Sequence, residues 1–344
     1  MQNKRLVEID ILRVLCISLL ISDHSFAIYS NTWTKPECID NITLYYWIGK
    51  FCQSFMLPLW VFISGFLWSY QVIGLERTSN LYTLLSKKTH KLLLPCYLFG
   101  VAYILLIGEL SDLITLKGIY YYLCGVGHLW FLPMLFWAFI FSYFIQKFRI
   151  NDTLLLIVLF VISIVSWNIA SLGIGNALYY LFYFQFGFIC FKYRDRINPI
   201  LSNWTYIILA ITLFIVIFPY LTSYLEVVTP SNVNTISERA ISQIKMHIIS
   251  APCQILGIVI CYGIAVRFQP IVINSKIISQ IAAYSFGLYI FHQFILIWLY
   301  YHSSIPTVIV SGLLPWIAII ITISISAILI KISIHTKLGR KILL

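Results

Sequence analysis

Long runs of apolar residues, each interrupted by few charges, recur along the whole of this chain. Runs of about 15 to 25 mostly apolar residues match the length that a helix needs to cross a bilayer. No linker, charge block or clear internal repeat divides the sequence, which indicates a single bundle. We therefore predict an all-α integral membrane protein, one domain over residues 1–344, with about ten transmembrane helices. The predicted spans are 7–29, 51–73, 92–110, 128–145, 153–172, 174–191, 204–225, 247–266, 277–301 and 307–330.

Composition and charge support this class. The chain is 60% hydrophobic and only 10% charged, which excludes a disordered chain and an ordinary water-soluble domain. With the N-terminus in the cytoplasm, 17 of the 23 Lys and Arg residues fall in cytoplasmic segments, five fall outside, and Arg13 lies within the membrane. This bias places both termini in the cytoplasm. The net charge of +11 is thus a topology signal that needs no nucleic-acid partner, and the expected surroundings are membrane lipids.

The two ends and the cysteines add little further chemistry. The first apolar run carries Arg13 in its body and lacks a small-residue cleavage site, so we expect it to be retained. Only about fourteen residues follow Ile330, so no soluble C-terminal domain is expected. Most of the cysteines lie in or beside spans and are typical of small packing residues. Cys38 lies in an outer loop and could pair with Cys52 or Cys124, although spacing cannot establish a disulfide.

The first predicted span holds the most informative pair, Arg13 and His24. Their separation of eleven residues corresponds to about 20° past three full turns and about 16 Å of rise. Both side chains therefore lie on one stripe of the helix, at depths where ionisable groups usually face a cavity or a partner helix. We predict a cavity that runs across the membrane along this stripe.

Each of these residues also has a purely structural interpretation. His24 follows Asp23 and could serve as a general base, or it could make a hydrogen bond that packs two helices together. Arg13 lies three residues after Asp10, the spacing of an intrahelical ion pair, or it could hold a phosphate or a carboxylate. Helix geometry alone does not choose between these alternatives.

Other polar residues mark boundaries and helix faces. Lys88 and Lys91 share a predicted face before the third span, where basic clusters contact anionic lipid or, alternatively, bind a nucleotide phosphate. Ser64 and Gly65 form a small pair in the second span, which favours close helix packing.

Two further segments, His128-Leu-Trp130 and Ser285-Phe-Gly-Leu-Tyr289-Ile-Phe-His292, place histidines beside aromatic residues. Ser285, Tyr289 and His292 fall within about 40° of one line on their predicted helix. No two histidines lie three or four residues apart and no carboxylate clusters with them, so we predict no metal site.

Taken in order, these segments resemble the membrane acyltransferase-3 family, whose members acylate bacterial cell-surface glycans and related acceptors. The resemblance rests on five segments: Asp10-Ile-Leu-Arg13 with His24, Pro58 with Phe62-Ile-Ser-Gly-Phe-Leu67, Lys88 and Lys91 with Pro95, His128-Leu-Trp130-Phe-Leu, and Ser285 to His292. At Lys88 and Lys91 the family has arginines, so that part of the resemblance is weaker, because lysine cannot form the same bidentate fork.

The resemblance implies a multi-pass O-acetyltransferase of the bacterial inner membrane. It would use cytoplasmic acetyl-CoA as donor and a hydroxyl of a surface polysaccharide or lipid-linked glycan as acceptor. It implies His24 and Arg13 as catalytic residues, and a substrate-binding set of Asp10, Ser64, Lys88, Lys91, His128, Trp130, Ser285, Tyr289 and His292. The alternative, a secondary transporter that exports a glycan precursor, explains the hydropathy pattern of ten spans equally well.

Overall fold

The computed structural model describes residues 5–77, 80–108, 115–148, 150–166, 172–228 and 236–343, and throughout these ranges the chain forms helices and no strands. Eight helical stretches within them are long and apolar enough to cross a membrane. They are α2 with a π-helical end (Thr43–Gly74), α3 to α4 (Leu81–Leu106), a 3₁₀ turn with α6 (Gly127–Ile145), α8 (Ile174–Lys192), α10 (Trp204–Val228), α11 (Ile236–Val272), α12 (Lys276–Tyr301) and α14 (Leu314–Ile334).

The other two predicted spans are helical but differ from these eight. Helix α1 (Val7–Ser25) has 19 residues, and its four Asp, Glu and Arg side chains set it apart from an ordinary apolar span. Helix α7 (Asp152–Val165) has only 14 residues, and residues 167–171 of that predicted span lie outside the described ranges. The count of ten spans therefore stays a prediction.

The last predicted span begins later than expected. The short helix α13 (Ile305–Val308) and a turn precede α14, so the predicted 307–330 becomes Leu314–Ile334. Pro315 in the first turn of α14 explains this boundary, because proline fits the start of a helix. Two further short helices, α5 (Leu116–Cys124) and α9 (Arg194–Leu201), connect longer ones.

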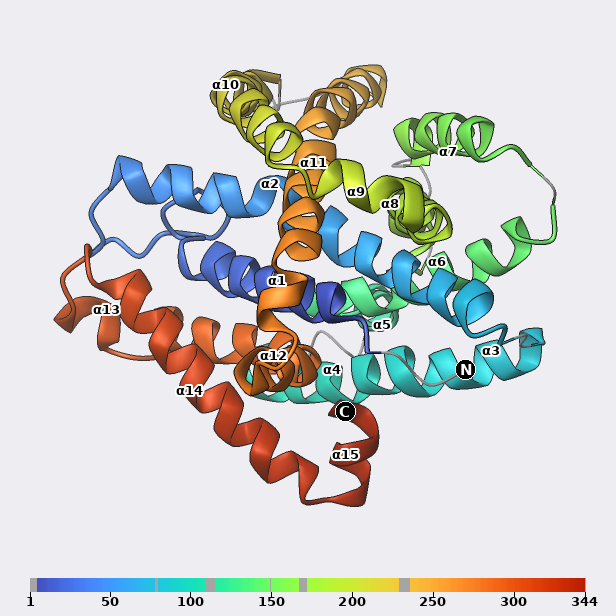
Figure 1. Ribbon diagram of the computed structural model, residues 1–344. Helices are drawn as coiled ribbons and strands as arrows, with labels where there is room; N and C mark the ends of the chain where they lie inside the picture. The colour runs from blue at the N-terminus through green and yellow to red at the C-terminus, as the bar shows by residue number, and fades with distance from the viewer. Residues whose placement is uncertain are drawn as a thin grey trace.

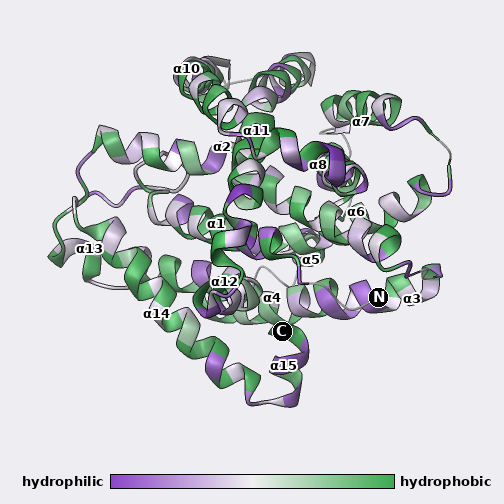
Figure 2. Cartoon of the chain, in the orientation of Figure 1, coloured by the Kyte–Doolittle hydropathy of each residue, from purple (hydrophilic) through white to green (hydrophobic). Residues whose placement is uncertain are grey.

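Helix α1 lies in the middle of the bundle and packs against α2, α11, α12 and α14 (Figure 1). Hydrophobic residues run along α7, α10 and α14 at the rim (Figure 2). This arrangement explains how α1 tolerates Arg13 and Asp23, because a central helix presents its polar residues to other helices instead of lipid.

Helices α2 and α8 pack closely through glycines. A Cβ atom at Gly65 would lie 1.8 Å from the carbonyl oxygen of Phe184, and one at Gly187 would lie 2.0 Å from that of Phe62. The expected close packing at Gly65 is therefore confirmed. The contact fixes α2, whose neighbouring residue Ser64 lines the cavity described below.

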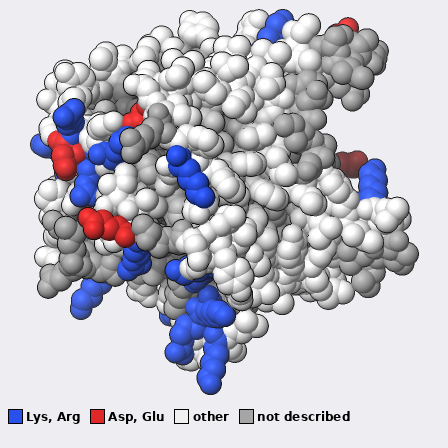
Figure 3. Space-filling model, turned by 90° about the vertical axis from the view of Figure 1, so that its right-hand side faces the viewer, with Lys and Arg blue, Asp and Glu red and all other residues white. Residues whose placement is uncertain are grey.

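The chain after α14 folds back onto the bundle. Helix α15 (Lys337–Leu343) buries Ile342 and Leu343 and presents the basic residues Lys337, Arg340 and Lys341. Lys and Arg side chains gather at the lower edge of the molecule, the level of α15 in Figure 1 (Figure 3).

All eight cysteines are free. The alternative that pairs Cys38 with Cys52 or Cys124 is not realised, and the Cys38 thiol lies 3.7 Å from the carbonyl oxygen of Pro306 instead.

Candidate functional site

A cavity of about 280 Å³ lies between α1, α2, α6, α12 and α15, and we call it the Arg13 cavity. It brings together five of the predicted site residues from four separate parts of the chain: Arg13, Ser64, Lys91, Ser285 and Tyr289. Most of the remaining wall is aliphatic or aromatic. A mostly apolar pocket with a few converging polar groups is the usual form of a small-molecule site.

Arg13 lies in this cavity without an ion-pair or hydrogen-bond partner among the described residues. The alternative that pairs Arg13 with Asp10 is not realised. Asp10 instead accepts a 2.6 Å hydrogen bond from Nε of Arg5, which reaches back from the segment before the helix. Asp10 remains near enough to act on Arg13 electrostatically. The guanidinium is therefore available to an anionic ligand.

The two predicted lysines separate. Lys91 lines the cavity and its Nζ donates to the carbonyl oxygen of Lys341, at 3.1 Å. Nζ of Lys88 lies 3.2 Å from the ring centroid of Phe139, outside the cavity lining. The expectation of a shared face is wrong because the helix widens into a π turn over Thr89–Leu93, and that turn shifts the register after Lys88.

Helix α15 closes one end of the cavity, a position that the hydropathy pattern did not predict. Ile342 and Leu343 are 3% and 2% exposed and line the cavity beside Lys91. The signal in the sequence was an apolar Ile-Leu-Leu ending directly after Arg340 and Lys341, typical of a helix with one buried face.

Three histidines from distant parts of the chain meet near the opposite end. The ring of His292 lies 4.9 Å from that of His24 and 5.0 Å from that of His128, centroid to centroid. Tyr289 links the cluster to the cavity, because it lines the cavity while its hydroxyl donates to the carbonyl oxygen of His128 at 2.7 Å. Leu20 makes a second link, since it lines the cavity and lies one turn before His24.

Backbone carbonyls determine which nitrogen of each neutral ring is protonated. His24 Nδ1 lies 3.1 Å from the carbonyl of Leu20, and His292 Nδ1 lies 2.6 Å from that of Tyr289. His128 uses Nε2 instead, 3.0 Å from the carbonyl of Ile290. Because a carbonyl can only accept, the bonded nitrogen carries the proton and the other keeps a lone pair. No described residue bonds the second nitrogen of any of the three rings, so each can accept a proton.

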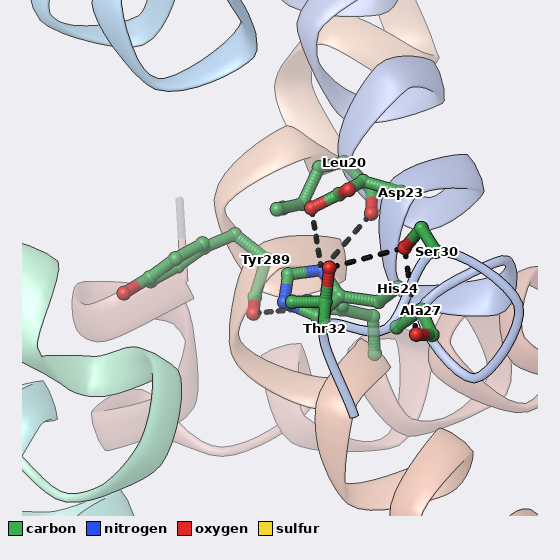
Figure 4. Close-up of polar contacts among 8 residues, drawn as sticks. Leu20, Asp23, His24, Ala27, Ser30, Thr32 and Tyr289 are labelled. Atoms are coloured by element: carbon green, nitrogen blue, oxygen red, sulfur yellow. Dashed lines mark hydrogen bonds and ion pairs between the residues drawn. The ribbon is translucent and has the colours of Figure 1, made fainter. Parts of the chain in front are cut away.

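Local backbone features hold these rings in place. The loop after α1 folds over His24 and brings the Trp33 ring to 5.3 Å from the imidazole. Figure 4 shows His24 between this loop and Tyr289, with its contacts to Leu20 and Asp23. Gly127, with φ of 54°, turns the chain before His128 at a point where a Cβ would lie 2.7 Å from the Tyr103 ring.

Six predicted site residues lie outside the cavity lining: Asp10, His24, Lys88, His128, Trp130 and His292. Trp130 is outside the cavity lining and contacts the rings of Phe131 and Tyr180. His24 itself does not line the cavity, which approaches it at Leu20. Among the described residues, no group of three His, Cys, Asp or Glu side chains is arranged to hold a metal ion.

An unpaired cation in a membrane cavity, with imidazoles that keep free lone pairs near the opposite end, defines a site suited to binding an anion and moving a proton. Residues 6–335 match the family described as an acyltransferase domain. The chain therefore belongs to the acyltransferase-3 family and is a multi-pass membrane acyltransferase. No curated protein and no solved structure shows significant similarity to it.

Proposed function

We propose that this acyltransferase moves an acetyl group from acetyl-CoA to a hydroxyl of a surface polysaccharide or lipid-linked glycan. The observation that carries the proposal is the unpaired Arg13 guanidinium in a cavity that ends within one turn of His24. Family membership favours transfer over the alternative of a transporter. We further propose that it works in the bacterial inner membrane with both termini in the cytoplasm.

The donor enters at the end of the cavity that holds Lys91 and α15. Arg13 and Lys91 make charge-assisted hydrogen bonds to its phosphates, which are about twice as strong as neutral ones. Lys88 contributes its positive charge from outside the lining, and Asp10 orients the start of α1 through Arg5. The pantetheine arm follows the apolar wall past Ser64 and Ser285. Both hydroxyls donate to their own helices, at 3.0 and 2.8 Å, and keep acceptor capacity for an amide.

His24 acts as the general base, with its free Nε2 as the accepting atom. The acceptor oxygen attacks the thioester carbon, its proton passes to Nε2, and the carbon–sulfur bond breaks. The imidazolium then returns the proton to the departing CoA thiolate, so the products are an acetyl ester and free CoA. His128, His292 and Tyr289 pack around the base and orient the thioester carbonyl, and Trp130 supports this cluster through its ring contacts to Phe131 and Tyr180.

The test is transfer of labelled acetyl from acetyl-CoA into a glycolipid extract by the purified protein in nanodiscs. His24→Ala should abolish labelling while expression and donor binding persist. The matched control is His302→Ala, because His302 is exposed at the end of α12 and belongs to no cluster. Labelling that survives His24→Ala at normal expression would eliminate His24 as the base, and substrate flux without labelling would favour a transporter.

A further inference from the structure

A second cavity, of about 430 Å³, lies between α2, α8, α10 and α11, and we call it the Gln254 cavity. Leu57 lines both this cavity and the Arg13 cavity, so a single side chain belongs to both walls. On the predicted topology it faces the outside, because it lies towards the start of α2 and the end of α10.

Its lining is rich in neutral polar side chains. Amide and hydroxyl groups come from three helices: Gln53, Ser54, Thr222, Gln243, Ser250 and Gln254. Gln53 and Gln243 make no hydrogen bond to any described residue, so both retain two donors and an acceptor. This capacity to donate and accept at several points matches a ligand that carries several hydroxyl groups.

One wall also holds an unpartnered buried nitrogen. His247 is 2% exposed, and its Nε2 lies 2.6 Å from the Ser163 hydroxyl, which is 2.5 Å from the Phe160 carbonyl. The hydroxyl therefore donates to Phe160 and accepts from Nε2, which leaves Nδ1 as a lone-pair acceptor. No described residue satisfies Nδ1, and a buried polar atom in that state costs about 1 to 3 kcal/mol.

Pro58 and aromatic rings complete the lining. Pro58 has no N–H, so the carbonyl of Ser54 lacks its usual partner one turn ahead, and both residues line the cavity. Tyr179 and Tyr180 line the cavity as well and offer ring faces to the apolar face of a sugar ring.

The charge of the cavity argues against a phosphate. Its one lysine, Lys50, lies 3.5 Å from Glu226, which also accepts from the hydroxyl of Tyr46. A cation already paired with a carboxylate offers little to an anion. Lys50 also interacts electrostatically with Asp23, the residue before His24.

We propose that the Gln254 cavity binds the acceptor as a neutral sugar ring, held by amide groups and stacked on tyrosine. The proposal rests on the acetyl transfer proposed above. It adds the cavity in which the acceptor binds and the part of the acceptor that is bound. The two substrates thereby approach from opposite sides of Leu57, with Asp23 and His24 beside the acceptor.

The test replaces Gln53 and Gln243 by leucine, singly and together, in a source strain that lacks its native copy. Neither substitution removes a hydrogen bond within the described structure, so folding should persist. The matched control is Gln71→Leu, which lies at the far end of the α2 stretch outside both cavities. Acetyl on surface glycans is measured by mass spectrometry, and labelled acetyl-CoA binding is measured on each purified protein.

We expect each single change to lower acetylation about 3- to 10-fold and the double change about 10- to 100-fold, from the loss of one or two neutral hydrogen bonds. Donor binding should stay at the wild-type level. Wild-type acetylation in the double variant, or an equal loss of donor binding and acetylation, would overturn the acceptor site. A wild-type protein that acetylates no glycan would refute the proposed function itself, which is a separate result.

Discussion

Replacing Arg13 by methionine should leave the protein as stable as the wild type, or more stable, while weakening donor binding strongly. Removing Arg13 breaks no hydrogen bond or ion pair with any described residue. Methionine keeps most of the apolar stem and fills similar volume, and it removes a partly buried cation that has no ion-pair partner. Removing an unpaired cation also removes the cost of keeping that charge away from water, whereas removing one member of a buried pair costs about 3 to 5 kcal/mol.

The expected loss in binding follows from the contact that the cavity allows. Hydrogen bonds to charged groups contribute about 1.5 to 3 kcal/mol, which corresponds to a factor of about 10 to 150 in affinity. Arg13→Lys should give an intermediate value, because lysine retains the charge but loses the bidentate fork. Arg196→Met is the matched control. Arg196 is exposed in α9 and lies outside the cavity, so donor affinity should not change.

The assay combines labelled acetyl-CoA binding with thermal unfolding, both on protein in nanodiscs. Unchanged donor affinity in Arg13→Met would refute the assignment of this residue to the donor. A fall of several kcal/mol in the free energy of unfolding would show instead that Arg13 is a structural residue with an essential partner.

Three further predictions follow from individual contacts. Gly65→Ala should lower the free energy of unfolding by at least about 1 to 3 kcal/mol, since its Cβ would meet the Phe184 carbonyl at 1.8 Å. The control, Gly312→Ala, should leave thermal unfolding unchanged, because no atom lies nearer than 4.0 Å to its Cβ. Tyr289→Phe should cost about 1 to 3 kcal/mol and slow transfer, because the buried carbonyl of His128 loses its donor, and an unchanged melting temperature and rate would contradict this. In a Ser64→Cys background, replacing Ile342 and Leu343 together by serine should speed labelling of the new thiol by a membrane-impermeant maleimide. Both side chains close the cavity that Ser64 lines. An equal labelling rate would show that α15 is no barrier.

Hydropathy predicted the helices well, because each span must bury its own backbone hydrogen bonds in lipid and so needs an unbroken apolar run. It was least informative where a helix is not lipid-exposed. Helix α1 is surrounded by other helices, so its charges are compatible with the membrane although they depart from an apolar pattern. The start of α14 depended on a short helix and a turn near Pro306 and Pro315, which window averages smooth over.

Contacts that depend on tertiary structure were harder to predict. Spacing placed Asp10 beside Arg13, but spacing cannot show that Arg5 would reach Asp10 first from outside the helix. The π turn that separates Lys91 from Lys88 has no clear signature in the sequence. Five residues of the Arg13 cavity were nevertheless predicted. Arg13 was indicated by its place as an ionisable group inside an apolar span, and the other four were implied by the family resemblance.

The position of two of these groups on one helix has a mechanistic consequence. Arg13 and His24 are separated by about 16 Å of continuous α-helix, and a helix of this length deforms little along its axis. The distance between the cation and the base is therefore fixed within α1, whatever movement admits the donor past α15. His128 and His292 depend on contacts between helices and can shift when the bundle moves. Of the three imidazoles, only His24 keeps a constant position relative to a ligand anchored at Arg13, which is why we assign the proton transfer to it.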